Sequence, residues 1–239
     1  MDNNNQLLFD SASSTFMHIF SYEDKSVLPR RVVFILDRSG SMGTTKWESA
    51  VAATVGAIQN LKPNIDRMNI ILFDDESILY SASSMVLVTD EVISDSVSWI
   101  NGYRSDGSTN LYQAVIDGLN LIKNDIDFAS NPYEFVNQVI LVTDGQPTAG
   151  VTDPTEIQNG ILSANDELNP ALCAIFVLGI GQDSGNGWVS DLNYPLLRSI
   201  ATQNEGFDAR IKQSQTEEIL ADYYNILESP VLSYIILNY

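Results

Sequence analysis

Two kinds of hydrophobic pattern alternate along the chain. In the first, apolar residues follow one another almost without interruption, which is typical of strands buried on both faces of a sheet. In the second, apolar residues recur every three or four positions, which predicts amphipathic helices. The first pattern covers residues 30–37, 68–74, 135–143 and 171–181, and the second covers residues 46–61, 90–100, 110–123, 154–166, 191–204 and 216–227. The alternation predicts an α/β domain with a mostly parallel sheet and helices on both faces.

Further strands are predicted where the apolar pattern is shorter or alternates. Residues 76–88 are predicted to form a strand that pairs antiparallel with the strand before it, through an acidic turn at Asp74. Residues 206–211 add one more strand. Residues 14–22 and 229–239 lie outside the regular alternation, and we expect them to pair with each other or with the edge of the sheet.

The composition excludes several classes of partner. The chain has 239 residues, of which 44% are hydrophobic, and this suits one large globular domain. A net charge of -19 opposes binding to nucleic acid or to an anionic membrane surface, and favours cations and basic protein patches. Cys173 is the only cysteine, so no internal disulfide or zinc–cysteine cluster can form, and its apolar surroundings predict a buried, unreactive thiol. We expect neither a signal peptide nor a membrane-spanning segment.

Small oxygen-bearing side chains gather at three predicted loops. Ligands of such sheets bind where the strands end, so these loops are candidates for one shared site. They contribute Asp37, Ser39 and Ser41 after the first strand, Asp106, Ser108 and Thr109 before a helix, and residues 143–145 after a later strand. Carboxylates and hydroxyls suit a hard divalent cation, Mg2+, Mn2+ or Ca2+, rather than zinc or copper. Since most of these donors are neutral, a bound cation would keep a position open for an anionic oxygen from elsewhere.

Each of these loops has other interpretations when taken alone. The segment from Asp37 to Ser41 is also typical of a turn or a helix cap, and residues 143–145 of an ordinary turn. A phosphatase or dehalogenase nucleophile would need a second acid where Ser39 stands. A serine hydrolase would need a Gly-x-Ser-x-Gly elbow and a late histidine, whereas the only histidine is His18. Residues 178–185 lack the third glycine of a dinucleotide fingerprint. We therefore do not expect an enzyme.

The order of the three loops resembles a known family. "VVFILDRSGSM" (32–42), "SDGSTN" (105–110) and "VILVTDGQPTAG" (139–150) are similar to the metal-ion-dependent adhesion site of von Willebrand factor type A domains. The resemblance implies a Rossmann-like, mostly parallel six-stranded sheet with one antiparallel edge strand. It also implies a metal site and a ligand-binding rim. The implied metal ligands are Asp37, Ser39, Ser41, Thr109 and Asp144, and the implied rim residues are Arg38, Met42, Asp106, Ser108 and Gly145.

Two positions depart from the commonest pattern of that family. Arg38 places a cation beside the proposed ligands, although its position in the strand should point its side chain away. Ser108 stands where many relatives have glycine, and a serine is tolerable there if the backbone needs no positive φ. Neither change removes a ligand.

A closer likeness within the family concerns the segments around the domain. "FMHIFSYEDKSVLPRRVVFILDRSGSM" (16–42), "GYRSDGSTNLYQAV" (102–115) and "SPVLSYIILNY" resemble inter-alpha-trypsin inhibitor heavy chains. This likeness implies a leading segment with an extra strand over 1–29, a type A domain over 30–228, and a trailing strand over 229–239 that leads to another domain. It also implies one module of a larger multidomain protein, extracellular or at the cell surface.

Two hypotheses of function follow from the resemblance. In the first, the domain is an adhesion-type protein-binding module, whose single divalent cation receives an Asp or Glu of a protein ligand. Mg2+ is the expected cation, with Mn2+ and Ca2+ as alternatives. In the second, the domain is a scaffold in a larger protein, and its cation site is filled but engages no partner.

Overall fold

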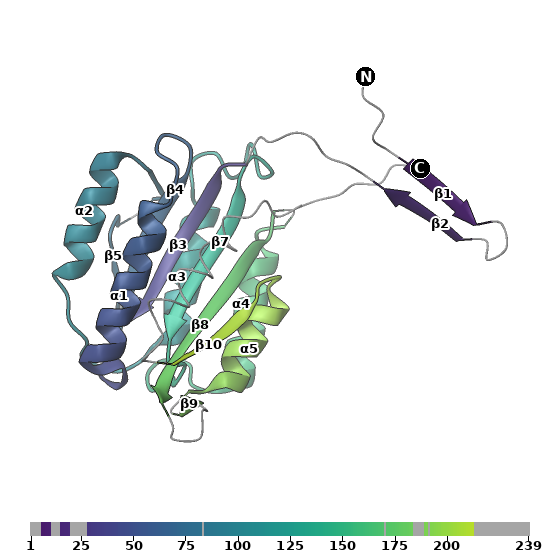
Figure 1. Cartoon of the computed structure of the whole chain (residues 1–239). Coiled ribbons are helices and arrows are strands. Elements are labelled where there is room, and N and C mark those ends of the chain that lie inside the picture. The colour runs from purple at the N-terminus through teal and green to yellow at the C-terminus, as the bar shows by residue number, and fades with distance from the viewer. Residues whose placement is uncertain are drawn as a thin grey trace.

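Five parallel strands and one antiparallel strand form the body of the central sheet (Figure 1). A computed structural model of the chain describes residues 6–10, 15–19, 28–82, 84–169, 171–183, 189–190 and 192–212. The sheet order is β10 (Asp208–Lys212), β8 (Cys173–Asp183), β7 (Val136–Thr143), β3 (Arg30–Asp37), β4 (Arg67–Phe73) and β5 (Ser77–Leu79), with β5 antiparallel at one edge. Two short strands add to it, β6 (Val86–Leu87) beside β4 and β9 (Val189–Ser190) beside β8.

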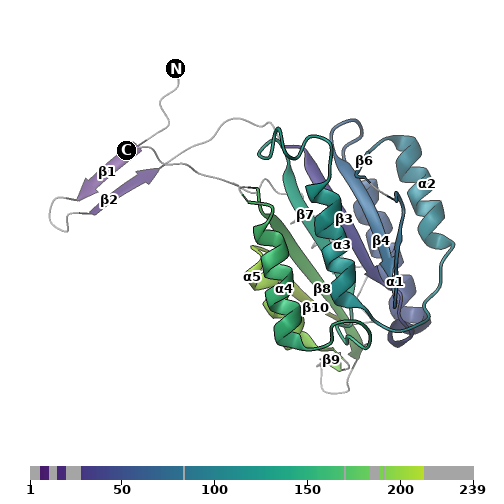
Figure 2. The ribbon, with the colours of Figure 1, turned by 180° about the vertical axis from the view of Figure 1, so that it is seen from behind.

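Helices cover both faces of this sheet, as the alternation predicts. Figure 1 shows α1 (Gly43–Gln59) and α2 (Asp90–Asn101) in front of the sheet. Figure 2, from behind, shows α3 (Leu111–Lys123) and α4 (Pro154–Asp166) on the opposite face, where α5 (Tyr194–Gln203) also packs. The prediction of a doubly wound α/β fold with one antiparallel edge strand is confirmed.

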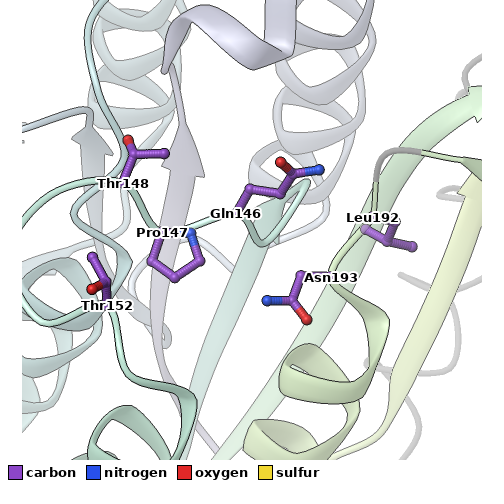
Figure 3. A pocket seen from close by; sticks show the side chains of 6 residues that line it. All are labelled: Gln146, Pro147, Thr148, Thr152, Leu192 and Asn193. Carbon is purple, nitrogen blue, oxygen red and sulfur yellow. The ribbon is translucent and has the colours of Figure 1, made fainter.

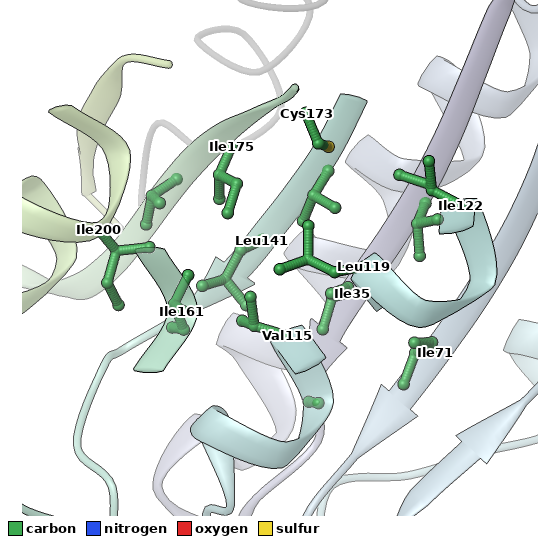
Figure 4. Packing of buried hydrophobic residues seen from close by; sticks show 14 of the residues in the cluster. Ile35, Ile71, Val115, Leu119, Ile122, Leu141, Ile161, Cys173, Ile175 and Ile200 are labelled. Carbon is green, nitrogen blue, oxygen red and sulfur yellow. The ribbon is translucent and has the colours of Figure 1, made fainter. Parts of the chain in front are cut away.

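Alternate residues of each central strand enter two separate cores. Along β3, Phe34 packs into the cluster that includes α1 and α2, whereas Ile35 packs into the cluster that includes α3, α4 and α5. Figure 4 shows Ile35 with Leu141 of β7 and Leu119 of α3 in the second cluster. A strand buried on both faces has no solvent side, and this explains the uninterrupted apolar runs in the sequence.

The predicted strand over 76–88 is wrong in extent. The structure has two short strands instead, β5 and β6, and both pair antiparallel with β4. The buried amide of Asn69 accounts for the break, because its nitrogen donates to the carbonyl oxygens of Ser81 and Ser84 at 2.9 and 2.8 Å. These bonds hold the intervening chain as a loop against β4.

The predicted pairing of residues 14–22 with 229–239 is not tested, because residues 229–239 lie outside the described residues, and in the described part of the chain residues 15–19 do not pair with the central sheet. Residues 15–19 do form a strand, β2 (Thr15–Ile19), but it pairs antiparallel with β1 (Gln6–Asp10) in a separate two-stranded sheet. A short connection makes this local hairpin easier to close than a pairing with a distant segment. The helix predicted over 216–227 and the strand over 229–239 lie outside the described residues. None of the described helices is long and apolar enough to cross a membrane.

Candidate metal centre

Three loops meet at the carboxyl ends of β3 and β7. The backbone nitrogen of Gly40 donates to the oxygen of Gly107 at 2.9 Å, so the loop after β3 is joined to the loop before α3. The backbone nitrogen of Thr148 donates to the oxygen of Thr109 at 2.9 Å, which joins the loop after β7 to the same segment. The structure therefore brings the three predicted loops together at one edge of the sheet.

The first loop holds a buried carboxylate beneath two hydroxyls. Oδ1 of Asp37 accepts a hydrogen bond from the backbone nitrogen of Ser39 at 2.8 Å. A single 3-10 turn, Gly40–Met42, then brings Ser39 Oγ and Ser41 Oγ to within 3.0 Å of each other. Ser39 is buried and Ser41 is exposed, so the hydroxyl pair runs from the interior to solvent. Neither this turn nor α1 receives a side-chain cap at its N-cap residue, which does not favour the helix-cap interpretation.

The third loop supplies a second buried carboxylate. Thr143 Oγ1 donates to Asp37 Oδ2 at 2.5 Å and accepts from the backbone nitrogen of Gly145 at 2.9 Å, so it links the first loop to the third. Asp144 is 1% exposed, and its Oδ2 accepts from Lys46 Nζ of α1 at 3.2 Å. Its Oδ1 has no hydrogen-bond partner in the described part of the chain.

The sequence did not predict that Thr143 links the first loop to the third, or that Lys46 is the partner of Asp144. A signal for Lys46 was present, however, because Lys46, Ala50, Ala53 and Ala57 recur at helical spacing and all four are buried on α1. A lysine on a buried stripe needs a partner, since its ammonium loses its hydration there.

The second loop contributes one buried hydroxyl residue, one exposed hydroxyl residue and one exposed carboxylate residue. Thr109 is 2% exposed, and its backbone nitrogen donates to Thr148 Oγ1 at 2.9 Å. Asp106 and Ser108 are exposed at the surface. Ser108 is not among the residues with positive φ, whereas Gly107 has a φ of 84°. The serine is therefore compatible with the backbone at its position, and the glycine supplies the left-handed turn.

The predicted rim residues do not all lie at the surface. Met42 is 1% exposed and packs in the core beside α1, and Gly145 is buried against Leu197. Neither residue is exposed to a ligand in this structure, because the turn at Gly40–Met42 directs Met42 inward and Leu197 lies against Gly145. Arg38 is half-buried and its guanidinium forms an ion pair with Asp74, so it does not neutralise Asp37 or Asp144.

Burial raises the pKa of Asp37 from 3.8 to about 6. The hydrogen bonds from Ser39 and Thr143 oppose this shift, and the negative charge of Asp144 adds to it. Two carboxylates that repel each other in a buried place are stabilised by a cation between them.

The residues present fit a divalent cation. The donors are the two carboxylates and the hydroxyls of Ser39, Ser41 and Thr109, all oxygen ligands of the kind that Mg2+ prefers. The unpartnered Oδ1 of Asp144 is a buried polar atom that a cation would satisfy. Within the described residues no group of three or more His, Cys, Asp or Glu side chains is placed to hold a metal, so a cation here would depend on the hydroxyls.

Concave surfaces lie on two sides of these loops. A pocket of about 480 Å³ lies beside Asp144 (Figure 3). The backbone carbonyl oxygen of Asp144 accepts a hydrogen bond from the backbone nitrogen of Asn193, which lines this pocket, at 3.1 Å. It is lined by Gln146, Pro147, Thr148, Thr152, Leu192 and Asn193. On the side of α1, a groove of about 870 Å³ runs between that helix and residues 101–105.

This arrangement defines a class of protein, an α/β domain whose oxygen donors converge where parallel strands end. A family model of the von Willebrand factor type A domain matches residues 32–223. The chain therefore belongs to the von Willebrand factor type A domain family.

Among curated proteins, the chain is similar to inter alpha-trypsin inhibitor, heavy chain 4 of Mus musculus. The two are 32% identical over 225 residues, which are 94% of this chain and 22% of the relative. The heavy chain H4 of Homo sapiens is 29% identical over the same share of this chain and 23% of its own length. The chain thus spans about a quarter or less of the curated relatives that it matches.

A solved structure shares the fold at low identity. The manganese-loaded TRAP protein of Plasmodium vivax aligns with a TM-score of 0.54 and 17% identity, over 82% of this chain and 73% of that one.

Proposed function

We propose that this domain binds a protein ligand through one divalent cation held by Asp37, Ser39, Ser41, Thr109 and Asp144. The observation that carries the proposal is the buried pair of carboxylates, of which Asp144 keeps one oxygen without a partner in the described chain. Mg2+ is the expected cation because the donors are hard oxygens, and Mn2+ or Ca2+ are alternatives.

Each residue has a separate task in this proposal. Asp37 and Asp144 supply negative charge beneath the cation, and Thr143 holds Asp37 in place through its hydroxyl. Ser39, Ser41 and Thr109 supply neutral oxygens, so they add no charge. The cation, when bound, supplies a Lewis-acidic position for an Asp or Glu carboxylate of the ligand. The exposed Ser41 and the exposed residues Asp106 and Ser108 mark where that carboxylate would approach from solvent.

The proposal extends to the setting of the domain. The heavy chains it matches are about four times longer, which supports a role as one module of a larger, extracellular or cell-surface protein. The net charge of -19 argues against nucleic acid as partner and favours a protein ligand with basic residues around its acidic contact.

The first test is a melting-temperature titration of the chelator-treated chain with Mg2+, Mn2+ and Ca2+. A ligand that binds only the folded state stabilises it by about 2.7 kcal/mol at a hundred times its Kd. For a domain of this size, each kcal/mol raises Tm by roughly 2–4 °C. We expect the shift in the wild type and its loss in Asp37→Ala. Asp95→Ala removes an exposed carboxylate from α2 and should keep the shift.

A second test addresses the acidic contact. The domain would be applied to arrays of matched peptides, in Mg2+ and in EDTA. The two members of each pair differ only in having Asp or Glu in one and Asn or Gln in the other. We expect retention of acidic members in Mg2+ alone, and no retention of Asp37→Ala. The scaffold hypothesis is the better one if the wild type shows the metal-dependent Tm shift, and yet peptides are retained by the wild type in EDTA and by Asp37→Ala.

A further inference from the structure

Lys46 is the buried cation of the candidate site. It lies on α1, is 3% exposed, and its ammonium forms an ion pair with Oδ2 of Asp144 at 3.2 Å. A lysine is seldom this buried without a partner, because its ammonium gives up strong hydration. The ammonium is therefore committed to the same carboxylate that would bind the metal.

Lys46 leaves half of that carboxylate free. Oδ1 of Asp144 has no hydrogen-bond partner among the described residues, whereas Oδ2 is occupied by the ammonium. A cation at Oδ1 and the ammonium at Oδ2 can therefore be present together. Arg38, also at this edge, is tied to Asp74 and does not replace Lys46 in this role.

The charges of Asp37, Asp144 and Lys46 decide which ions the site attracts. Two carboxylates and one ammonium carry a net charge of about -1 when all are ionised, and a divalent cation changes it to about +1. Without the ammonium the same two states would carry about -2 and 0. Lys46 therefore weakens the attraction for the metal, and it leaves the metal-loaded site positive in a buried place.

We propose that Lys46 couples the cation to the ligand: it lowers the affinity for the cation alone, and makes tight cation binding depend on an incoming carboxylate. This inference rests on the proposed function. It adds a regulation to that function: the site binds the metal weakly without the ligand carboxylate and tightly with it.

The experiment measures Mn2+ binding to the chelator-treated full chain, by the electron paramagnetic resonance signal of free Mn2+. Lys46→Met removes the charge and keeps most of the side-chain volume. Lys46→Gln removes the charge and can still donate a hydrogen bond to Asp144. Lys123→Met is the matched control, since Lys123 is exposed and pairs with Glu167 on the surface. All three variants change the net charge of the chain equally.

We expect both Lys46 variants to bind Mn2+ about tenfold more tightly than the wild type, and Lys123→Met to bind as the wild type does. Acetate serves as the probe for the ligand carboxylate. It should tighten Mn2+ binding in the wild type and in Lys123→Met, and have a smaller effect in the two Lys46 variants. A residue that only supports the fold would change Tm without changing these affinities.

Two outcomes separate the inference from the proposed function. If the wild type binds Mn2+ and the Lys46 variants bind it equally or more weakly, Lys46 only positions Asp144 and the inference is wrong. If neither the wild type nor any variant binds Mn2+, the proposed function itself fails. Should Lys46→Met fold poorly by circular dichroism, Lys46→Gln decides, because it can keep the hydrogen bond that packing requires.

Discussion

Buried charges lie at both ends of the parallel sheet, but they are satisfied in different ways. At the amino end, Asp125 receives one hydrogen bond from Arg31 at 2.5 Å and one from Arg67 at 2.8 Å. The guanidinium of Arg31 also lies 4.0 Å from the ring centroid of Phe135. At the carboxyl end, Asp37 and Asp144 meet hydroxyls, backbone nitrogens and one ammonium.

The difference between the two ends is one of charge, because Arg31 Nη1 and Nη2, like Asp144 Oδ1, have no hydrogen-bond partner in the described chain. Guanidinium groups bring several donors and a full positive charge, so the carboxylate of Asp125 is neutralised by the protein itself. Hydroxyls donate one hydrogen bond each and bring no charge, so Asp37 and Asp144 remain under-neutralised. The end of the sheet whose charges are not balanced by arginines is the end that suits an added cation.

The largest expected effect is at the amino end. Asp125→Ala leaves the fully buried Arg31 without its carboxylate partner, and breaking a buried ion pair on one side costs about 3–5 kcal/mol. Urea unfolding at neutral pH in EDTA would measure this loss. The exposed pair of Lys123 and Glu167 provides the reference, because Lys123→Met removes an ion pair that solvent screens and should change the unfolding free energy little. If Asp125→Ala and Lys123→Met lose the same unfolding free energy, the proposed distinction between the two ends of the sheet is wrong.

A smaller effect is expected from the pH dependence at the carboxyl end. The pKa of Asp37 in the folded chain is about 6, above the ordinary 3.8, so the folded state holds a proton that the unfolded state releases. Its contribution to stability is complete below pH 3.8 and is lost as the pH rises through 6. The difference between the folded and the ordinary pKa of Asp37 corresponds to about 3 kcal/mol.

Asp37→Asn isolates this contribution, because the amide does not titrate. In EDTA, the unfolding free energy of the wild type should fall by roughly 2.4 kcal/mol relative to that of Asp37→Asn between pH 4 and pH 7, because part of the contribution is already lost at pH 4. Saturating Mg2+ should reverse the trend, since the cation binds the ionised carboxylate. If the curves of unfolding free energy against pH are parallel for the two proteins, with and without Mg2+, the pKa of Asp37 is not raised in the folded chain.

Sequence reasoning worked best where local chemistry decides the structure. The boundaries of β3 and α4 agree with the predictions, and α4 begins where Asp153 accepts from the backbone nitrogens of Thr155 and Glu156 and Pro154 opens the helix. These signals lie within a few residues of one another, so they can be read from the sequence directly.

Reasoning from the sequence failed where distant contacts decide. Thr143 bonds to a residue 106 positions away, and Lys46 to one 98 positions away, so neither partner is visible in a local pattern. The burial of Met42 was not expected from the sequence, because it depends on the turn between Ser39 and α1. The assignment of ligands to a metal came from family resemblance, and it stays a prediction until a metal is measured.

The smallest expected signal comes from Cys173, at the first position of β8 and therefore at the amino end of the sheet. Its thiol is fully buried, as predicted from the sequence, and burial raises its pKa above the ordinary range, so the reactive thiolate is scarce. We expect iodoacetamide to leave the native chain unlabelled while it labels the urea-unfolded chain. In EDTA, Asp125→Ala should speed the native labelling more than Asp37→Ala does. The reason is that Asp125→Ala weakens the cluster at the same end of the sheet as Cys173. Labelling rates that follow only the global unfolding free energies of the two variants would indicate that the two ends open together, as one cooperative unit.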